Sequence, residues 1–148
     1  LSKMPTARAF ADAVVVDRQV YVIGGENQQG ALATNERYTP AEDGSGNPWN
    51  TQTSLAVASK RPNAAAVGNL IFVFGTDQSS TTCAVYNPDT DSWQSLTTPF
   101  TTMSDARTHA VGINKLYVVG GRSADGFGTQ VYEYQPTFTV FLPGVQQR

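Results

Sequence analysis

The feature of this sequence that most constrains its fold is a short apolar segment that occurs three times. The copies are VYVIGG at residues 20–25, IFVFGT at 71–76 and LYVVGG at 116–121. Each copy is followed by a tyrosine with a proline two residues later, and Tyr38, Tyr86 and Tyr134 recur at an interval of 48 residues (86−38 and 134−86). A constant period of this length is typical of a repeat architecture, in which neighbouring units bury each other's apolar faces.

Each copy is also the second strand of a predicted hairpin. In the first unit, apolar residues 9–16 are followed by the dipeptide Asp17-Arg18 and then by residues 19–23. Two apolar runs separated by a two-residue turn predict a hairpin. The pattern recurs at residues 63–67 with 70–74, and at 108–113 with 116–119. Because the repeated segments are apolar at successive positions, we expect these strands to be covered on both faces.

A polar loop follows each glycine pair, and a third strand then ends at the tyrosine. A fourth strand begins at Trp49 in the first unit and at Trp93 in the second, and Phe141 occupies that position in the third. Each unit is therefore predicted to be a four-stranded antiparallel sheet. No segment combines a 3.6-residue apolar period with helix caps, so no helix is predicted. The predicted boundaries are 1–8 for the end of a preceding unit, 9–55, 56–103 and 104–142 for three units, and 143–148 for a tail.

The order of apolar strand, Gly-Gly, Tyr and Trp, with Arg8, Arg61 or Arg107 at the head of the unit, resembles the Kelch repeat. The resemblance covers essentially the whole chain. It implies an all-β fold of three four-stranded antiparallel blades that form half or part of a β-propeller ring. It also implies that the motif glycines let the second strand turn out tightly and that the motif aromatics pack between blades. These motif residues are Gly24, Gly25, Gly75, Gly120, Gly121, Tyr38, Tyr86, Tyr134, Trp49, Trp93 and Phe141.

The middle unit departs from this pattern at Thr76, which replaces the second glycine. That position therefore does not need a backbone conformation reserved for glycine.

Composition and charge exclude several kinds of partner. The formal net charge is −2 and the ten basic residues are scattered, so nucleic acid and anionic membrane surfaces are not expected partners. No apolar run approaches the roughly 20 residues of a membrane span, so no membrane insertion is expected. Lysine is scarce while Thr, Ser, Asn and Gln are abundant, which favours an extracellular or cell-surface protein. We also expect a secreted protein of bacterial source.

Residues capable of catalysis or metal binding are few. The single His109 and single Cys83 do not make a typical zinc site. The segment 89–91 lacks the glycine and distal glutamate of a calcium loop and is predicted to be a turn. The glycine-rich segment 120–128 precedes no predicted helix that could bind phosphate. We therefore predict no catalytic residue, no metal and no cofactor.

The resemblance to Kelch repeats implies where binding takes place. The loops after the glycine pair and those leading into the first strand would lie on one face of the ring. The three arginines have two readings, because they can bond backbone carbonyls within the blades or take part in binding. The candidate binding residues are Glu26, Asn27, Gln28, Asp77, Gln78, Arg122, Ser123, Asp125 and Phe127 in the loops, with Arg8, Arg61, Asn63, Arg107 and His109 nearer the axis.

Two functions follow from this resemblance. The first is a non-catalytic module for protein or glycan interaction, or a structural role, within a larger extracytoplasmic assembly. The alternative is a sugar-acting enzyme of the sialic-acid epimerase type. Three blades leave two apolar end faces, so we expect a protein partner there: further blades of the same polypeptide or a homo-oligomeric copy. We favour further blades, because residues 1–8 read as the end of a preceding one.

Overall fold

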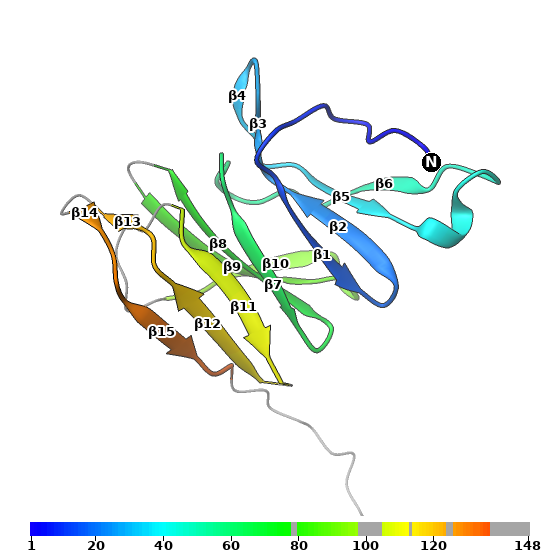
Figure 1. Cartoon of the computed structure of the whole chain (residues 1–148). Coiled ribbons are helices and arrows are strands. Elements are labelled where there is room, and N and C mark those ends of the chain that lie inside the picture. Colours follow the sequence, from blue (N-terminus) through cyan, green and yellow to red (C-terminus); the bar gives the residue numbers. More distant parts are fainter. Residues whose placement is uncertain (78–79, 98–104, 113, 124–125, 137–148) are drawn as a thin grey trace, which may run out of the picture.

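The computed structural model describes residues 1–77, 80–97, 105–112, 114–123 and 126–136. Within these ranges the chain is built from antiparallel β-strands, as predicted, with one short 3-10 turn, η1(Pro40–Glu42). Three sheets follow one another along the chain and stand side by side in a fan (Figure 1). None of the described residues forms a helix long and apolar enough to cross a membrane.

The sheets repeat one topology, in which the strands follow in chain order from the inside of the fan to its outside. The first sheet consists of β1(Asp12–Val16), β2(Gln19–Ile23), β5(Asn35–Tyr38) and β6(Trp49–Gln52). The second consists of β7(Asn63–Val67), β8(Leu70–Asp77), β9(Ser80–Asn87) and β10(Ser92–Ser95). The third shows β11(Arg107–Val111), β12(Lys115–Val119) and β15(Val131–Tyr134), and its predicted fourth strand, with Phe141, lies outside the described residues.

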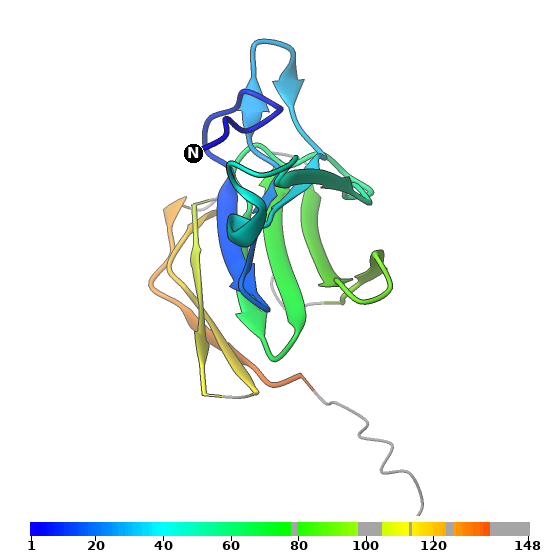
Figure 2. The ribbon, with the colours of Figure 1, turned by 90° about the vertical axis from the view of Figure 1, so that its right-hand side faces the viewer.

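Two small hairpins project from the ends of β2 and β12. They are β3(Glu26–Asn27) with β4(Gly30–Ala31), and β13(Arg122–Ser123) with β14(Gly126–Phe127). In Figure 2 the first of them stands clear of the sheets at the top of the molecule. We call this side of the sheets, which also carries the segments leading into the inner strands, the loop end.

The predicted inner hairpins are confirmed, with shifted boundaries: β11 and β12 each begin one residue earlier than predicted, and β8 continues to Asp77. The first strand begins at Asp12 and not at Ala9, because Phe10 adopts a positive φ of 58° and Ala9 forms an isolated bridge with Glu26. The register is the same in all three hairpins: Asp12 pairs with Ile23, Asn63 with Phe74 and Arg107 with Val119. Asp12, Asn63 and Arg107 are therefore equivalent positions.

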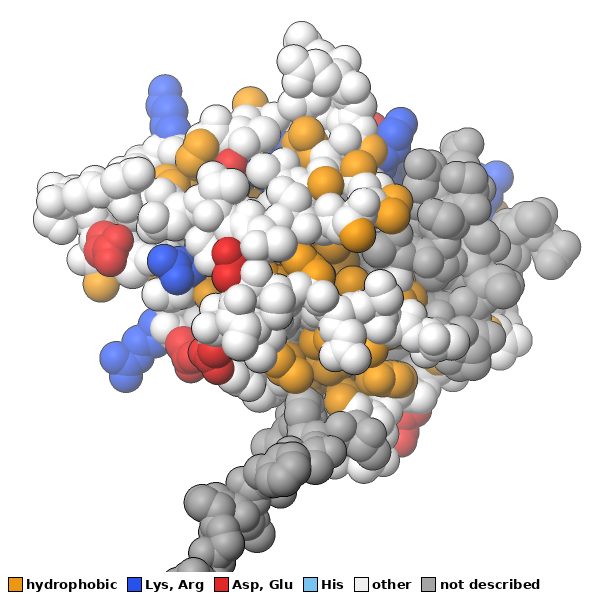
Figure 3. All heavy atoms as spheres, turned by 180° about the vertical axis from the view of Figure 1, so that it is seen from behind, with side chains coloured by type: hydrophobic (Ala, Val, Ile, Leu, Met, Phe, Trp, Pro, Cys, Tyr) orange, Lys and Arg blue, Asp and Glu red, His pale blue; other side chains and the backbone are white. Residues whose placement is uncertain are grey.

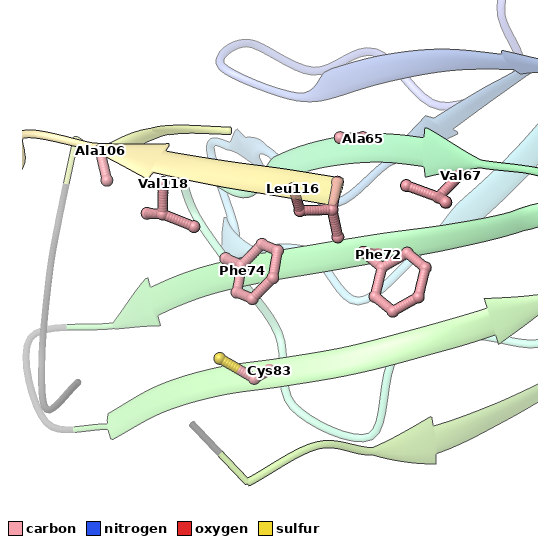
Figure 4. Close-up of a cluster of buried hydrophobic side chains, with 8 residues drawn as sticks. All are labelled: Ala65, Val67, Phe72, Phe74, Cys83, Ala106, Leu116 and Val118. Atoms are coloured by element: carbon pink, nitrogen blue, oxygen red, sulfur yellow. The ribbon is translucent and has the colours of Figure 1, made fainter. Parts of the chain in front are cut away.

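The core consists of two clusters between adjacent sheets, and the second sheet contributes side chains to both of them. Ile71 and Val73 pack against the first sheet, while Phe72 and Phe74 pack against Leu116 and Val118 of the third (Figure 4). Seen from behind, apolar side chains run through the middle of the molecule and most charged ones lie at its periphery (Figure 3).

The expectation that all three repeated strands are covered on both faces is correct only for β8. In β2 the side chains of Tyr21 and Ile23 are buried against the second sheet, but Val20 and Val22 point to the other face and are only partly buried. In β12, Val119 is 43% exposed. The physical reason is position: within the described part of the chain, only the second sheet has a neighbouring sheet on each side.

The motif aromatics pack in two settings. Tyr86 lies between the first and second sheets, with its ring centroid 5.9 Å from that of Tyr21. Tyr134 lies between the second and third sheets, 6.0 Å from Phe72. Tyr38 and Trp49 pack against each other on the outer face of the first sheet, with ring centroids 4.9 Å apart, and for these two the expectation of packing between blades stays a prediction.

A hydrogen-bonded group, which we call the carboxylate clamp, joins the first two sheets. The Asp91 carboxylate accepts hydrogen bonds from the Tyr86 hydroxyl (2.5 Å) and the Thr53 backbone N–H (2.8 Å), while the Trp93 indole donates to the Thr53 carbonyl (2.8 Å). Burial raises the pKa of Tyr86 strongly, and Asp91 adds to the effect. Partial burial alone would raise the pKa of Asp91, but its hydrogen bonds lower it.

A second copy of the carboxylate clamp lies on the outer face of the first sheet. There Asp43 accepts from the Ser2 backbone N–H (2.8 Å), and Trp49 donates to the Ser2 carbonyl (3.3 Å). In this second clamp Ser2 provides the backbone N–H and carbonyl that Thr53 provides in the first. Thr53 directly follows the fourth strand of the first sheet. Residues 1–8 form no strand. Their assignment to a preceding unit, like the other unit boundaries, stays a prediction.

The glycine pairs turn the chain out of the second strand, as expected, in the first and third units. Gly24 and Gly25 have φ values of 62° and 92°, and Gly120 and Gly121 have values of 66° and 106°. The expectation is wrong for Gly75, which stays inside β8 in register with Thr82. In the middle unit β8 continues to Asp77 and pairs directly with β9, so no turn is needed there. Thr76 is accommodated within the strand for the same reason.

Gly25→Ala should destabilise the fold by about 2 to 3 kcal/mol, because a side chain there is strained and its Cβ would lie 2.6 Å from the Ala9 carbonyl oxygen. Gly46→Ala is the matched control, since a Cβ at Gly46 meets nothing within 4 Å. Urea unfolding followed by tryptophan fluorescence measures both changes. Equal stabilities of the two variants would contradict this account of the glycine pair.

Candidate functional site

The candidate site lies at the loop end, where the three segments that lead into the inner strands come together. The inner strands begin at residues 12, 63 and 107. The residues two positions before them are Phe10, Arg61 and Asp105. The Arg61 guanidinium carbon lies 4.3 Å from the centroid of the Phe10 ring. Its Nη1 atom lies 3.3 Å from Asp105 Oδ1. Equivalent positions of three successive sheets thus form one continuous row, which we call the rim row.

The rim row is open to solvent. Phe10 is 54% exposed, and the side chains of Arg61 and Asp105 are 53% and 52% exposed. A cation over an aromatic face is held by the ring quadrupole, and the carboxylate on the other side fixes the guanidinium further. The row therefore offers an ordered apolar surface, a positive group and a negative group next to one another.

The backbone at both ends of the rim row is unusual. Phe10 and Asp105 each have a φ of 58°, in the left-handed region that side chains other than glycine seldom adopt. A bulky aromatic residue pays a steric cost there of about 1 kcal/mol or more. Such strained positions cluster at functional sites, where the conformation serves to present a side chain.

A second row is formed by Asp12, Asn63 and Arg107, the first residues of the three inner strands. Asp12 accepts a hydrogen bond from the Ala64 backbone N–H (2.7 Å), and Arg107 Nη1 donates to Asn63 Oδ1 (3.0 Å). These side chains connect the inner strands of adjacent sheets in pairs. Asn63 is buried, so it supports the site from below and does not itself present a surface.

The three arginines that the sequence placed together occupy different positions, which corrects their assignment as equivalents. Arg8 lies four residues before its strand, Arg61 two residues before, and Arg107 is the first strand residue itself. Arg107 also donates to the Ala106 carbonyl (3.3 Å). An arginine count per unit could not show this difference, because it depends on where each inner strand begins.

Arg8 has a structural role. Its Nη2 atom lies 2.7 Å from Glu36 Oε2, and both side chains are almost fully buried, at 1% and 2% exposure. Its Nη1 donates to the carbonyls of Gly24 (3.0 Å) and Thr34 (3.2 Å). Burial lowers the pKa of Arg8, although the Glu36 carboxylate opposes that shift. For Arg8 the reading in which arginines bond backbone carbonyls within a blade is therefore confirmed.

Several of the predicted loop residues lie on the two hairpins of the loop end. Glu26 forms an ion pair with Lys60, with 3.5 Å between Oε2 and Nζ. Asn27 accepts from the Gln29 backbone N–H (2.9 Å) and so shapes its own turn, beside the exposed Gln28.

On the third sheet, Arg122 lies 5.7 Å from the centroid of the Phe127 ring, and that ring is 89% exposed. His109 is exposed on β11.

Some predicted site residues cannot be assigned a contact. Gln78 and Asp125 lie outside the described residues. Asp77 and Ser123 are placed in β8 and β13 by their backbones alone. Among the residues that the structure does describe, no group of three or more His, Cys, Asp or Glu side chains is arranged to hold a metal ion.

Sequence reasoning missed Phe10 and Asp105. Phe10 was assigned to the first strand, and Asp105 had no signal of its own. Their equal distance from the strand that follows would have identified both, but that distance is known only once Asp12 is fixed as the first residue of β1.

The comparisons with known proteins agree with this geometry. Residues 7–43, which contain Arg8, the first glycine pair and Tyr38, match the Kelch motif family. This match and the repeated sheets support a Kelch-repeat family for the chain. Its sheets are Kelch-type blades, of which the first two show all four strands.

Two relatives carry Kelch repeats. An F-box/kelch-repeat protein of Arabidopsis thaliana is 28% identical over 84% of this chain and 30% of its own length. The human Kelch repeat and BTB domain-containing protein 12 is 27% identical over 82% of this chain and 23% of its own length. The chain thus spans less than a third of the length of either relative.

Arg8→Met should cost about 3 to 5 kcal/mol of stability, because it leaves the buried Glu36 carboxylate unpaired. Arg61→Met should cost under about 1 kcal/mol, because its ion pair is exposed. Chemical denaturation of the parent and both variants measures the difference. If the two substitutions cost the same, the division into a structural and a surface arginine is wrong.

Proposed function

We propose that this Kelch chain is a non-catalytic interaction module that binds another protein through the rim row at its loop end. The observation that carries the proposal is the contact of Phe10, Arg61 and Asp105 across three blades, with each side chain about half exposed. Exposed aromatic and arginine side chains are the residue types enriched in the energetic centres of protein interfaces. Here they are already held in place before any partner arrives, which lowers the entropic cost of binding.

The surroundings of the rim row suit a protein surface. Lys60, next to Arg61 in the chain, forms an ion pair with Glu26 of the neighbouring hairpin, so charges of both signs border the aromatic centre. An apolar centre with a polar border is the usual layout of a protein interface. Glycan binding at the same loop end is the weaker part of the proposal, because the aromatic ring of the rim row, Phe10, is already covered on one side by Arg61.

The wider setting is also proposed. The names of the relatives join Kelch repeats with an F-box or a BTB domain, so in those proteins the repeats are one part of a longer chain. We propose that this chain, too, works within a larger assembly. Its extracellular or cell-surface location stays a prediction, which the lysine-poor composition supports. Its bacterial source also stays a prediction, and the relatives from a plant and from human do not address either one.

A random peptide library displayed on phage, selected against the 148-residue chain, tests the binding site. Selected peptides should lose affinity about tenfold or more with Phe10→Ala and with Arg61→Ala, because truncation of a central interface residue costs about 2 kcal/mol or more. Arg18→Ala is the control, since Arg18 is an exposed arginine of the β1–β2 turn at the opposite end of the sheet.

Peptides that bind the parent, Phe10→Ala and Arg61→Ala equally well would overturn the assignment of the site. A glycan array read on the same three proteins, together with an assay for conversion of any bound sugar, separates the module from the epimerase alternative. Turnover of a bound sugar would reject the non-catalytic function.

A further inference from the structure

The outer faces of the first and third sheets carry four of the exposed valines of this protein. Val15, on the first sheet, is 62% exposed, and Val111, Val119 and Val131, on the third, are 53%, 43% and 60% exposed. None of these belongs to the rim row. The two outer faces therefore need an explanation that is independent of the proposed function.

The outer face of the first sheet repeats the face by which the second sheet packs on the first. In the first hairpin Ala13 pairs with Val22, and in the second Ala64 pairs with Val73. Each is the second residue pair of its hairpin, so Ala13 is equivalent to Ala64 and Val22 to Val73. The later strands repeat it as well, because Tyr38 pairs with Trp49 as Tyr86 pairs with Trp93. The full set of equivalents is Ala13 and Ala64, Val15 and Ala66, Val20 and Ile71, Val22 and Val73, Tyr38 and Tyr86, Trp49 and Trp93.

The outer face of the third sheet repeats the opposite side of that interface. By register, Val111 is equivalent to Val16, Tyr117 to Tyr21 and Val119 to Ile23. Val16, Tyr21 and Ile23 are the residues that the first sheet buries against the second. The two exposed faces of one molecule thus reproduce the two halves of an interface that the same molecule already contains.

An aromatic contact recurs at each internal interface and indicates how the exposed faces would fit. Tyr21 meets Tyr86 with 5.9 Å between ring centroids, and Phe72 meets Tyr134 at 6.0 Å. In both pairs the first ring comes from the second strand of one sheet and the other from the third strand of the next sheet. By the same rule Tyr117 would meet a tyrosine at the position of Tyr38.

Polar groups border the faces in corresponding places. In the first sheet the Tyr21 hydroxyl donates to Gln19 Oε1 (3.2 Å) at the margin of the internal interface. In the third sheet the equivalent Tyr117 hydroxyl donates to Glu133, which also pairs with Lys115 (3.0 Å). The charges of Lys115 and Glu133 offset each other, so this pair adds no net charge beside the valines of the third sheet.

Part of the first outer face is already occupied by the chain itself. Ser2 is held against Trp49 and Asp43 by the carboxylate clamp, and Thr6 and Arg8 bond Glu36. What stays open is the inner hairpin β1–β2, with Val15 the most exposed of its outward-facing valines. A partner that seats there must therefore present a narrow, apolar, twisted pair of strands, which the hairpin β11–β12 provides.

We infer that the chain associates head to tail with a second copy of itself, the outer face of the third sheet packing on the outer face of the first. The contact is heterologous, because a different face is used on each side. It forms a closed pair of chains if the rotation between copies closes and an open series if it does not. The loop end and its rim row take no part in it.

Sedimentation velocity of the 148-residue chain over a range of concentrations tests this inference. The parent should form dimers or longer species, and Val15→Lys and Val119→Lys should each weaken association about tenfold or more, because each puts a charge into the contact. Val57→Lys is the matched control: Val57 is 45% exposed but lies in the connection between β6 and β7, away from both outer faces. Circular dichroism of each variant shows that it is folded.

A mixture of the two disabled variants separates this arrangement from a symmetric one. The Val15→Lys chain keeps an intact third sheet and the Val119→Lys chain keeps an intact first sheet, so together they should form a dimer that neither forms alone. A parent that stays monomeric, association that survives both substitutions, or a mixture that fails to restore the dimer would each overturn the inference.

Discussion

The structure depends on the burial of one strand, β8, between two sheets. Its residues alternate between the faces, so that Ile71 and Val73 pack on the first sheet while Phe72 and Phe74 pack on the third. Full burial of each such side chain contributes about 1.5 to 3 kcal/mol. The flanking strand β7 adds smaller side chains on both sides, with Ala64 toward the first sheet and Val67 toward the third. Because the two interfaces share one sheet, the loss of packing at one of them weakens the support of the other. The positions of the first and third sheets follow from this shared contact.

The packing of the sheets also determines which residues meet at the loop end. Once the inner strands β1, β7 and β11 lie next to each other, the residues that precede them by two positions also become neighbours, which brings Phe10, Arg61 and Asp105 into contact. Hydrogen bonds between backbone groups hold this end in shape: the Gly25 N–H donates to the Ser59 carbonyl at 2.9 Å, across the boundary between the first and second units. The proposed binding surface, assembled from separate blades, therefore depends on the interfaces beneath it.

Much of the fold was predictable from the chain alone, because the signals are local. Two apolar runs around Asp17-Arg18 are enough for a hairpin, and both turn residues do adopt positive φ values, of 47° and 63°. The site was less predictable. Arg8 and Arg61 look alike in sequence, yet one is 1% exposed beside Glu36 and the other is 53% exposed beside Phe10. Their partners lie far away in the chain. A difference of two positions relative to the start of the inner strand separates a buried, ion-paired arginine from a solvent-exposed one.

The sequence by itself determined the repeat, the strand order within each unit and the resemblance to Kelch repeats, since periodicity, glycine pairs and the tyrosine and tryptophan positions are properties of short segments. The tertiary structure alone decided which faces are covered, why Gly75 stays in a strand, and which of the three arginines reaches solvent. The physical reason is that burial and ion pairing depend on neighbours brought together by sheet packing. The apolar pattern of VYVI and LYVV is almost the same as that of IFVF, but only IFVF has a described sheet on each side.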